Sequence, residues 1–148
     1  PLAGAEERDH TICLSIDPTI VGDEAYCLDV NPQKVDVRAS SLRGLFYGMA
    51  SLMQLLPAEI ESGECASGAG WQIPAVTVKD TPRFAYRGLM LDVARHFISV
   101  EGLKKHIDML ASAKINTLHL HLSDYQGWRV EIKKYPRLTE IGGKRIVE

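Results

Sequence analysis

Alternation of apolar and polar residues near the start of the chain predicts strands. Residues 11–17 (TICLSID) and 26–38 (YCLDVNPQKVDVR) carry apolar side chains at every second position, as expected of strands with one buried face. Residues 31–34 (NPQK) interrupt the second segment with residues that favour turns. We therefore expect a strand followed by a hairpin.

After Ser41 the apolar period changes from two to three or four residues, which indicates a helix. The residues concerned are Leu42, Leu45, Met49, Leu52 and Leu56. Ser40 or Ser41 can accept hydrogen bonds from the first free backbone N–H groups of a helix, and Pro57 follows the last turn. This pattern predicts an amphipathic helix between Ser41 and Pro57.

The segment that follows this helix reads as a loop and then a strand. Residues 61–70 (ESGECASGAG) are rich in Gly and Ser and lack any period, which predicts a surface loop. Residues 71–78 (WQIPAVTV) return to a strand-like pattern, in which Pro74 fits only an edge strand because proline has no N–H. We expect residues 1–80 to form a small α+β domain, itself truncated at its start.

Beyond residue 80 the pattern becomes strand, helix, strand. Residues 86–93 (YRGLMLDV) and 115–122 (INTLHLHL) are apolar runs of strand length. Between them Ser99 can cap a helix whose apolar positions follow the helical period, namely Val100, Leu103, Ile107 and Leu110. A helix of this length allows the two strands to be parallel neighbours. The predicted fold class is α/β, a small α+β domain followed over residues 81–148 by a β-α-β unit.

Polar residues follow both predicted strands, where parallel α/β folds collect functional groups. They are Asp92, Arg95 and His96 after the first strand and His121, Ser123 and Asp124 after the second. The planar fork of Arg95 can hold two neighbouring hydroxyls or a carboxylate, although a surface ion pair with Asp92 explains it equally simply. Asp124 can orient a histidine or accept a bond from a substrate, or it can serve only as a helix or turn cap.

His119 and His121 lie on one face of the predicted strand because side chains alternate along a strand. Such a pair can bind a divalent metal in hydrolases, but a site needs further ligands. Histidines that are satisfied within the core explain the pair better. Tyr125 and Trp128 add aromatic surface, which suits the apolar face of a sugar ring, and Trp128 can equally be buried against a barrel wall.

Composition narrows the classes of function. The chain has 148 residues, 17 basic and 19 acidic side chains and a net charge of −2, without any run of Lys or Arg. This balance excludes nucleic acid and anionic membranes as expected partners. No apolar stretch reaches the roughly 20 residues of a membrane span. Cys13, Cys27 and Cys65 are odd in number and have neither metal nor redox spacing, so we expect small, semi-buried residues.

Two stretches resemble the start of the catalytic barrel of family 20 glycoside hydrolases, the β-N-acetylhexosaminidases. They are residues 80–97 (DTPRFAYRGLMLDVARHF) and residues 114–145 (KINTLHLHLSDYQGWRVEIKKYPRLTEIGGKR). The hairpin and helix before them resemble the small α+β domain that precedes the barrel in this family. The resemblance implies that residues 81–148 are the first β-α-β unit of an incomplete (β/α)8 barrel. The resemblance implies that Arg95 binds hydroxyls of the terminal sugar and that Asp124 supports the acid/base glutamate through a later histidine.

The resemblance also carries a mechanism and a departure. It implies exo-acting release of terminal N-acetylglucosamine or N-acetylgalactosamine from β-linked glycans, by a retaining mechanism in which the substrate's own acetamido group takes part. No cofactor is implied, His119 and His121 are implied to be structural, and a periplasmic, secreted or lysosomal location is suggested. Tyr125 stands where the family commonly has a second acidic residue, which affects the rim of the pocket.

The Asp-Glu pair of that mechanism belongs to a later barrel strand, and the chain begins without Met or an intact signal peptide. We therefore expect a fragment that is inactive alone and that associates with itself or with the remainder of the barrel. Two other classes remain open, a non-catalytic folding or assembly module and a metal-dependent hydrolase that uses His119 and His121.

Overall fold

The structure is a computed structural model that describes residues 10–62 and 70–145. The chain divides into two compact units, residues 1–85 and residues 86–148. We describe each unit by itself. No helix within the described residues is both long enough and apolar enough to cross a lipid bilayer.

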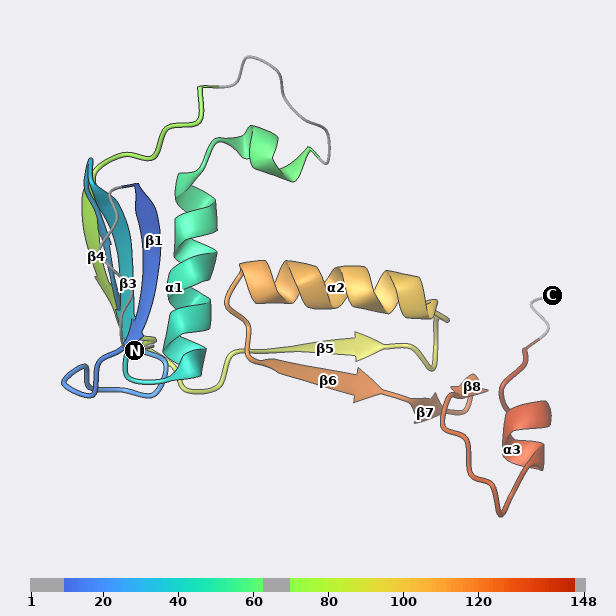
Figure 1. Cartoon of the computed structure of the whole chain (residues 1–148). Coiled ribbons are helices and arrows are strands. Elements are labelled where there is room, and N and C mark those ends of the chain that lie inside the picture. The colour runs from blue at the N-terminus through green and yellow to red at the C-terminus, as the bar shows by residue number, and fades with distance from the viewer. Residues whose placement is uncertain (1–9, 63–69, 146–148) are drawn as a thin grey trace. The chain divides into compact units, whose positions relative to one another are not determined.

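A four-stranded sheet forms one layer of the first unit (Figure 1). Its strands in chain order are β1 (Thr11–Ile16), β2 (Tyr26–Val30), β3 (Lys34–Ala39) and β4 (Val76–Asp80). In space the order is β1-β3-β2-β4, with β1 parallel to β3 and β2 antiparallel to both β3 and β4. The predicted strand and hairpin are confirmed.

The hairpin turn forms where the sequence indicated it. The side-chain oxygen of Asn31 accepts the backbone N–H groups of Gln33 at 2.9 Å and of Lys34 at 3.0 Å. A side chain that bonds its own backbone two or three residues on makes a compact turn, which is a common use of Asn. The turn therefore sets the register in which Val30 pairs with Val35.

Helix α1 (Leu42–Leu55) covers one face of this sheet (Figure 1). Of the two predicted caps, Ser41 is the residue used, since its hydroxyl accepts the N–H groups of Arg43 and Gly44. Pro57 lies two residues after the helix and begins the short 3-10 helix η1 (Ala58–Glu61) as its cap. The amphipathic helix is confirmed.

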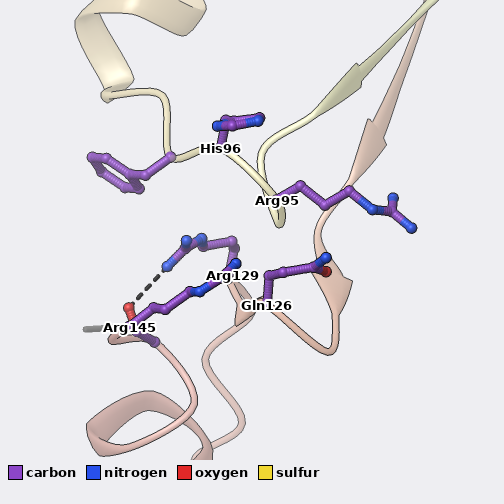
Figure 2. A pocket seen from close by; sticks show the side chains of 7 residues that line it. Arg95, His96, Gln126, Arg129 and Arg145 are labelled. Atoms are coloured by element: carbon purple, nitrogen blue, oxygen red, sulfur yellow. Dashed lines mark hydrogen bonds between the residues drawn. The ribbon is translucent and has the colours of Figure 1, made fainter. Parts of the chain in front are cut away.

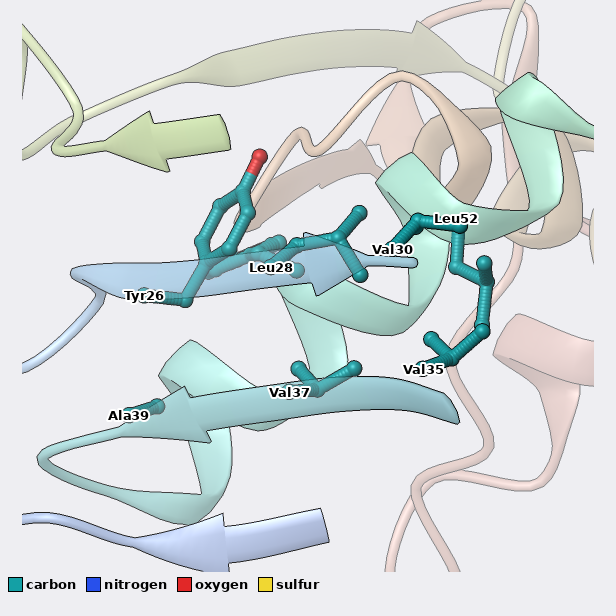
Figure 3. Close-up of a cluster of buried hydrophobic side chains, with 8 residues drawn as sticks. Tyr26, Leu28, Val30, Val35, Val37, Ala39 and Leu52 are labelled. Atoms are coloured by element: carbon teal, nitrogen blue, oxygen red, sulfur yellow. The ribbon is translucent and has the colours of Figure 1, made fainter. Parts of the chain in front are cut away.

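The core of the first unit lies between α1 and the sheet (Figure 3). Its buried members are Tyr26, Leu28, Val30, Val35, Val37, Ala39, Tyr47 and Leu52. Burying a side chain such as Leu28, which is fully inaccessible, contributes roughly 1.5–3 kcal/mol. Gly48 allows the helix to approach closely, because a Cβ there would lie 2.5 Å from Val37 Cγ1.

Strand β4 starts later than the sequence predicted. We expected a strand over residues 71–78, whereas β4 begins at Val76, two residues after Pro74. Pro74 has no N–H to give to the neighbouring strand, so pairing starts only beyond it. β4 is an edge strand, as predicted for this segment. Of the predicted loop over residues 61–70, positions 63–69 lie outside the described residues.

The described cysteines are free thiols. Cys13 is half-buried and Cys27 is buried, in line with the expected semi-buried residues. Burial raises the pKa of the Cys27 thiol. Cys65 lies outside the described residues.

The second unit is a β-α-β unit. Strands β5 (Gly88–Asp92) and β6 (Thr117–His121) are parallel, and α2 (Val100–Ser112) connects them. Ser99 caps the helix by accepting the N–H of Gly102 at 3.1 Å. The predicted fold class is therefore confirmed, an α+β sheet unit followed by a β-α-β unit, although both parallel strands are shorter than the apolar runs that predicted them.

Short elements that the sequence did not predict follow β6. Strands β7 (Ser123–Asp124) and β8 (Gly127–Trp128) form a small antiparallel ladder, and α3 (Arg137–Glu140) is a single turn of helix. Elements of two to four residues are too short to show a period, which is why pattern analysis misses them.

The second unit buries little apolar surface. Among its described residues, the buried hydrophobic side chains are Val93 and Ala94. Leu89 on β5 is 41% exposed and Met90 is 54% exposed. Within the described chain β5 and β6 pair only with each other. A two-stranded parallel sheet with exposed apolar side chains needs further structure to cover it.

Candidate active site

Four polar side chains meet beyond the carboxyl ends of β5 and β6. In the parallel register Asp92 lies opposite His121, so the two strands end at the same level. Arg95 follows β5 through a short turn, and Asp124 ends β7. The predicted clustering of polar groups at this edge is confirmed for Asp92, Arg95, His121 and Asp124.

Arg95 contacts both carboxylates of the cluster. Its Nη1 donates to Oδ2 of Asp92 at 2.5 Å, and its Nη2 lies 2.8 Å from Oδ2 of Asp124. The Arg95 side chain is 46% exposed, whereas both carboxylates are about half as exposed. The ion pair with Asp92 that the sequence allowed is present, and a second carboxylate joins it.

These contacts do not use all the N–H donors of Arg95. A guanidinium has five N–H donors arranged in a planar fork, and the two carboxylate contacts engage one donor on each terminal nitrogen. The ion pairs and a ligand-binding role are therefore compatible, because three N–H donors are not used by these contacts and the side chain is 46% exposed.

Asp92 shapes the turn that carries Arg95. Its Oδ1 accepts the backbone N–H groups of Ala94 at 3.1 Å and of Arg95 at 3.0 Å. The hydrogen bond from the Arg95 side chain, followed by that from the Arg95 backbone, lowers the pKa of Asp92 from 3.8 to about 2. Asp92 is therefore ionised at neutral and at moderately acidic pH.

Asp124 connects Arg95 with a histidine. Its Oδ2 lies 2.9 Å from Nε2 of His121, and its Oδ1 accepts the N–H of Tyr125 at 2.8 Å. The His121 bond is the main cause that lowers the pKa of the Asp124 carboxyl. Because an ionised carboxylate only accepts, Nε2 of His121 carries the proton in this contact. Asp124 thus bonds a histidine, as one interpretation of the sequence allowed, and its other oxygen accepts the N–H of the next residue.

The two histidines of β6 differ in their surroundings. His121 bonds Asp124, whereas His119 is exposed, so the interpretation of His119 as a core residue is wrong for this chain. Across residues 10–62 and 70–145, no group of three or more His, Cys, Asp or Glu side chains is arranged to hold a metal ion. His119 and His121 have no third ligand among these residues.

A pocket of about 670 Å³ opens beside the cluster (Figure 2). Its lining consists of Arg95, His96, Phe97, Gln126, Arg129, Gly143 and Arg145. Three of these side chains are arginines, so the pocket is cationic and rich in hydrogen-bond donors. The sequence singled out Arg95 and His96 but missed Gln126, Arg129 and Arg145.

The two aromatic candidates have different environments. Tyr125 is 87% exposed. Trp128 is half-buried, and its indole N–H donates to the carbonyl of Val130 at 2.5 Å. The indole of Trp128 is therefore tied to the nearby backbone, while Tyr125 is open to solvent.

A β-α-β unit with polar groups gathered at the carboxyl ends of its strands is the arrangement of an α/β enzyme domain. Two models of protein families match this chain. The model "Glycosyl hydrolase family 20, domain 2" matches residues 2–81, and "Glycosyl hydrolase family 20, catalytic domain" matches residues 84–148. This chain belongs to glycosyl hydrolase family 20.

Relatives with curated names agree with this family. The chain is 48% identical over 143 residues to a beta-hexosaminidase of Porphyromonas gingivalis, covering 96% of this chain and 18% of that protein. It is 42% identical over 128 residues to a beta-hexosaminidase of Akkermansia muciniphila, covering 86% of this chain and 24% of that protein. The chain thus spans about a fifth of the length of these relatives.

Solved structures share the fold. The Streptomyces plicatus N-acetyl-beta-hexosaminidase in complex with Thio-NAglucal superposes with a TM-score of 0.84 at 46% identity, covering 89% of this chain and 26% of that chain. The GH20 exo beta-N-acetylglucosaminidase of Vibrio harveyi in complex with N-acetylglucosamine gives a TM-score of 0.78 at 42% identity, covering 88% of this chain and 19% of that chain.

Proposed function

We propose that these residues form part of an exo-acting β-N-acetylhexosaminidase, which releases terminal N-acetylglucosamine or N-acetylgalactosamine from β-linked glycans. Family membership supports the reaction class. Two related structures, a mutant beta-hexosaminidase of S. plicatus and the V. harveyi enzyme, hold N-acetylglucosamine. Within this reaction, the 148 residues contribute sugar recognition and support of the acid.

The observation that carries the proposal is the pairing of Arg95 with Asp92 and Asp124. Two carboxylates hold the guanidinium in one orientation before a ligand binds. This preorganisation reduces the side-chain conformational entropy that is lost on binding. The remaining N–H groups of the fork can donate to two adjacent hydroxyls of a terminal sugar. Arg95 is therefore the proposed sugar-binding residue of this segment.

Asp124 is proposed to support the acid/base glutamate through a later histidine. An ionised carboxylate has about four acceptor positions. Arg95 and His121 both contact Oδ2, and Tyr125 contacts Oδ1. One position on Oδ1 is left by these contacts, so a further histidine N–H would bond Asp124 there.

The reacting groups of the proposed mechanism belong to other parts of the enzyme. The 2-acetamido oxygen of the sugar attacks the anomeric carbon while an aspartate holds the acetamido group and a glutamate gives its proton to the leaving oxygen. The configuration is retained, and the scheme needs no cofactor. In this scheme Arg95 binds the sugar whose anomeric carbon is attacked. Asp124 supports the protonated state of the acid/base glutamate through the later histidine.

The test uses a complete enzyme, by which we mean these residues joined to the remainder of a family 20 catalytic domain. Arg95→Ala should lower kcat/KM on a chromogenic N-acetylglucosaminide by about 10- to 100-fold, the effect of losing charge-assisted hydrogen bonds. The melting temperature should change little. Arg95→Lys keeps the charge but loses the fork, and should restore only part of the activity.

Arg43→Ala is the matched control. Arg43 is an exposed arginine that also pairs with one carboxylate, Asp23, at 2.8 Å, but it lies in the first unit. Its removal should leave kcat/KM unchanged. A specificity constant that is equal in Arg95→Ala and in Arg43→Ala would show that Arg95 does not bind the sugar.

A further inference from the structure

Arg129 makes contacts that the proposed reaction does not yet use. Its Nε donates to the carbonyl of Val93 at 2.9 Å, its Nη1 donates to the carbonyl of Gly143 at 2.8 Å, and its Nη2 reaches the carbonyl of Ala94 at 3.5 Å. The guanidinium also lies over the ring of Phe97, 5.4 Å from its centroid. The side chain is therefore directed at backbone carbonyls and at a ring.

Two of these carbonyls belong to the turn that carries Arg95. Asp92 binds the N–H groups of Ala94 and Arg95 in the same turn. The carboxylate of Asp92 thus fixes the amide side of the turn, and the guanidinium of Arg129 fixes its carbonyl side. Val93 and Ala94 are buried, at 7% and 0% exposure, so water cannot easily replace the lost partner.

The same guanidinium ties the turn to the segment after α3. The bond to Gly143 is drawn dashed in Figure 2, where the Arg95 guanidinium points away from that of Arg129. Arg129 is held in place by its own backbone N–H, which donates to the carbonyl of Leu122 just after β6 at 2.8 Å. Arg129 therefore connects three segments: its side chain bonds the turn after β5 and the chain beyond α3, and its backbone N–H bonds the residue after β6.

Gly127 leaves the room that this arrangement needs. A Cβ at position 127 would lie 2.8 Å from the carbonyl oxygen of Ala94 and 2.8 Å from Nη2 of Arg129. A larger residue there would push the arginine and the turn apart. The lack of a side chain at Gly127 is thus part of the same contact.

We propose that Arg129 is a positioning residue for sugar recognition, which holds the turn after β5 so that Arg95 presents its fork to the terminal sugar. The inference rests on the proposed function, because it assigns Arg129 an effect only through Arg95. Arg129 need not touch the sugar, since three of its five N–H donors are engaged with backbone carbonyls.

A double-mutant cycle in the complete enzyme tests this coupling. The measured quantity is the inhibition constant of N-acetylglucosamine, which reports binding of the terminal sugar, for the wild type, Arg129→Ala, Arg95→Ala and the double variant. We expect Arg129→Ala to weaken binding about tenfold when Arg95 is present and less than about twofold when Arg95 is already alanine. Arg137→Ala, an exposed arginine at the start of α3, is the control and should leave binding unchanged.

The possible failures are distinguishable. If Arg95→Ala leaves sugar binding intact, the proposed role of Arg95 fails, and the inference fails with it. If Arg95→Ala weakens binding but Arg129→Ala weakens it by the same factor in both backgrounds, Arg129 does not act through Arg95, and the proposed function stands alone.

Should Arg129→Ala fail to fold, Arg129→Lys takes its place. Lysine keeps the positive charge but cannot donate to three separate carbonyls from one planar group. We expect a loss of about threefold or more beside Arg95, with none beside Ala at position 95. Equal losses in the two backgrounds would overturn the inference.

Discussion

Nη2 of Arg95 lies 2.8 Å from Oδ2 of Asp124, and this contact joins two segments that follow neighbouring parallel strands. An ion pair at an exposed position contributes little to stability. The contact fixes the orientation of the Arg95 guanidinium, which is held between Asp124 and Asp92. Three of its five N–H donors are not used by these two contacts. We therefore expect substitutions of these residues to change ligand binding and pH dependence more than stability.

Asp124→Asn tests the link to the acid. The substitution keeps the shape of the side chain but removes the negative charge of the carboxylate that contacts Arg95 and His121. In the complete enzyme we expect lower activity and a displaced basic limb of the pH–rate profile, because that limb reports the essential acid. Asp108→Asn, at an exposed position on α2, should change neither. A reduced rate with an unmoved profile would assign Asp124 a structural role only.

Asp92 should make stability depend on pH in the acid range. Its pKa is about 2 in the folded protein and near 3.8 when unfolded, so the unfolded chain binds the proton more tightly. The stabilisation is therefore present above about pH 4 and is lost as the pH falls through about 2. Between these pH values, the melting temperature of the complete enzyme should fall more steeply with falling pH for the wild type than for Asp92→Asn. Parallel pH dependences would contradict the contact with Arg95.

Gly44 should be intolerant of a side chain although it lies within a helix. A Cβ at this position would overlap the carbonyl oxygen of Ala25 and lie 2.8 Å from Cβ of Ala39. Alanine normally stabilises a helix relative to glycine by up to about 1 kcal/mol, but overpacking costs roughly 1–3 kcal/mol. We expect a lower melting temperature for Gly44→Ala. Gly70→Ala, where the new Cβ meets nothing within 4 Å, should be neutral, and equal melting temperatures for both variants would refute the close approach.

The 148 residues made alone should show no hexosaminidase activity and should self-associate. The proposed reaction needs an Asp-Glu pair from a later strand, and β5 and β6 pair only with each other in the described chain. Apolar side chains on this unit are open to solvent, including Met90 at 54% and Met109 at 62% exposure. Light scattering and a fluorogenic N-acetylglucosaminide measure the two properties.

Lysine substitutions can distinguish association through the exposed strand β5 from nonspecific aggregation. Met90→Lys should reduce the associated fraction, whereas Val21→Lys, at an equally apolar and 87% exposed position of the first unit, should not. A monomeric wild-type chain would contradict the exposed edge. Genuine turnover by this chain would contradict the assignment of the reacting groups to other parts of the enzyme.

Much of the fold follows from local signals. Ser41 and Pro57 bracket α1, and Ser99 starts α2, because hydroxyl caps and proline act on the backbone within a few residues. The start of β4 at Val76 was less predictable. There the apolar pattern continues through Pro74, and the missing N–H decides where pairing begins.

The site was predictable in position but not in its connections. Arg95 and Asp124 stand at strand ends that the apolar runs locate, but their contact depends on the register that sets Asp92 opposite His121. Arg129 carried no such signal. Its partners are backbone carbonyls, which every residue has, so only a lone arginine between Trp128 and Val130 marks it in the sequence.

A crystal structure of the complete enzyme with N-acetylglucosamine bound tests the central claim most directly. The measurement is the distance from the Arg95 guanidinium nitrogens to the hydroxyl oxygens of the sugar. We predict two nitrogen–oxygen distances of about 2.7–3.2 Å to adjacent hydroxyls, with Asp92 and Asp124 still in contact with Arg95. A bound sugar whose hydroxyls lie beyond hydrogen-bond reach of Arg95 would contradict the account.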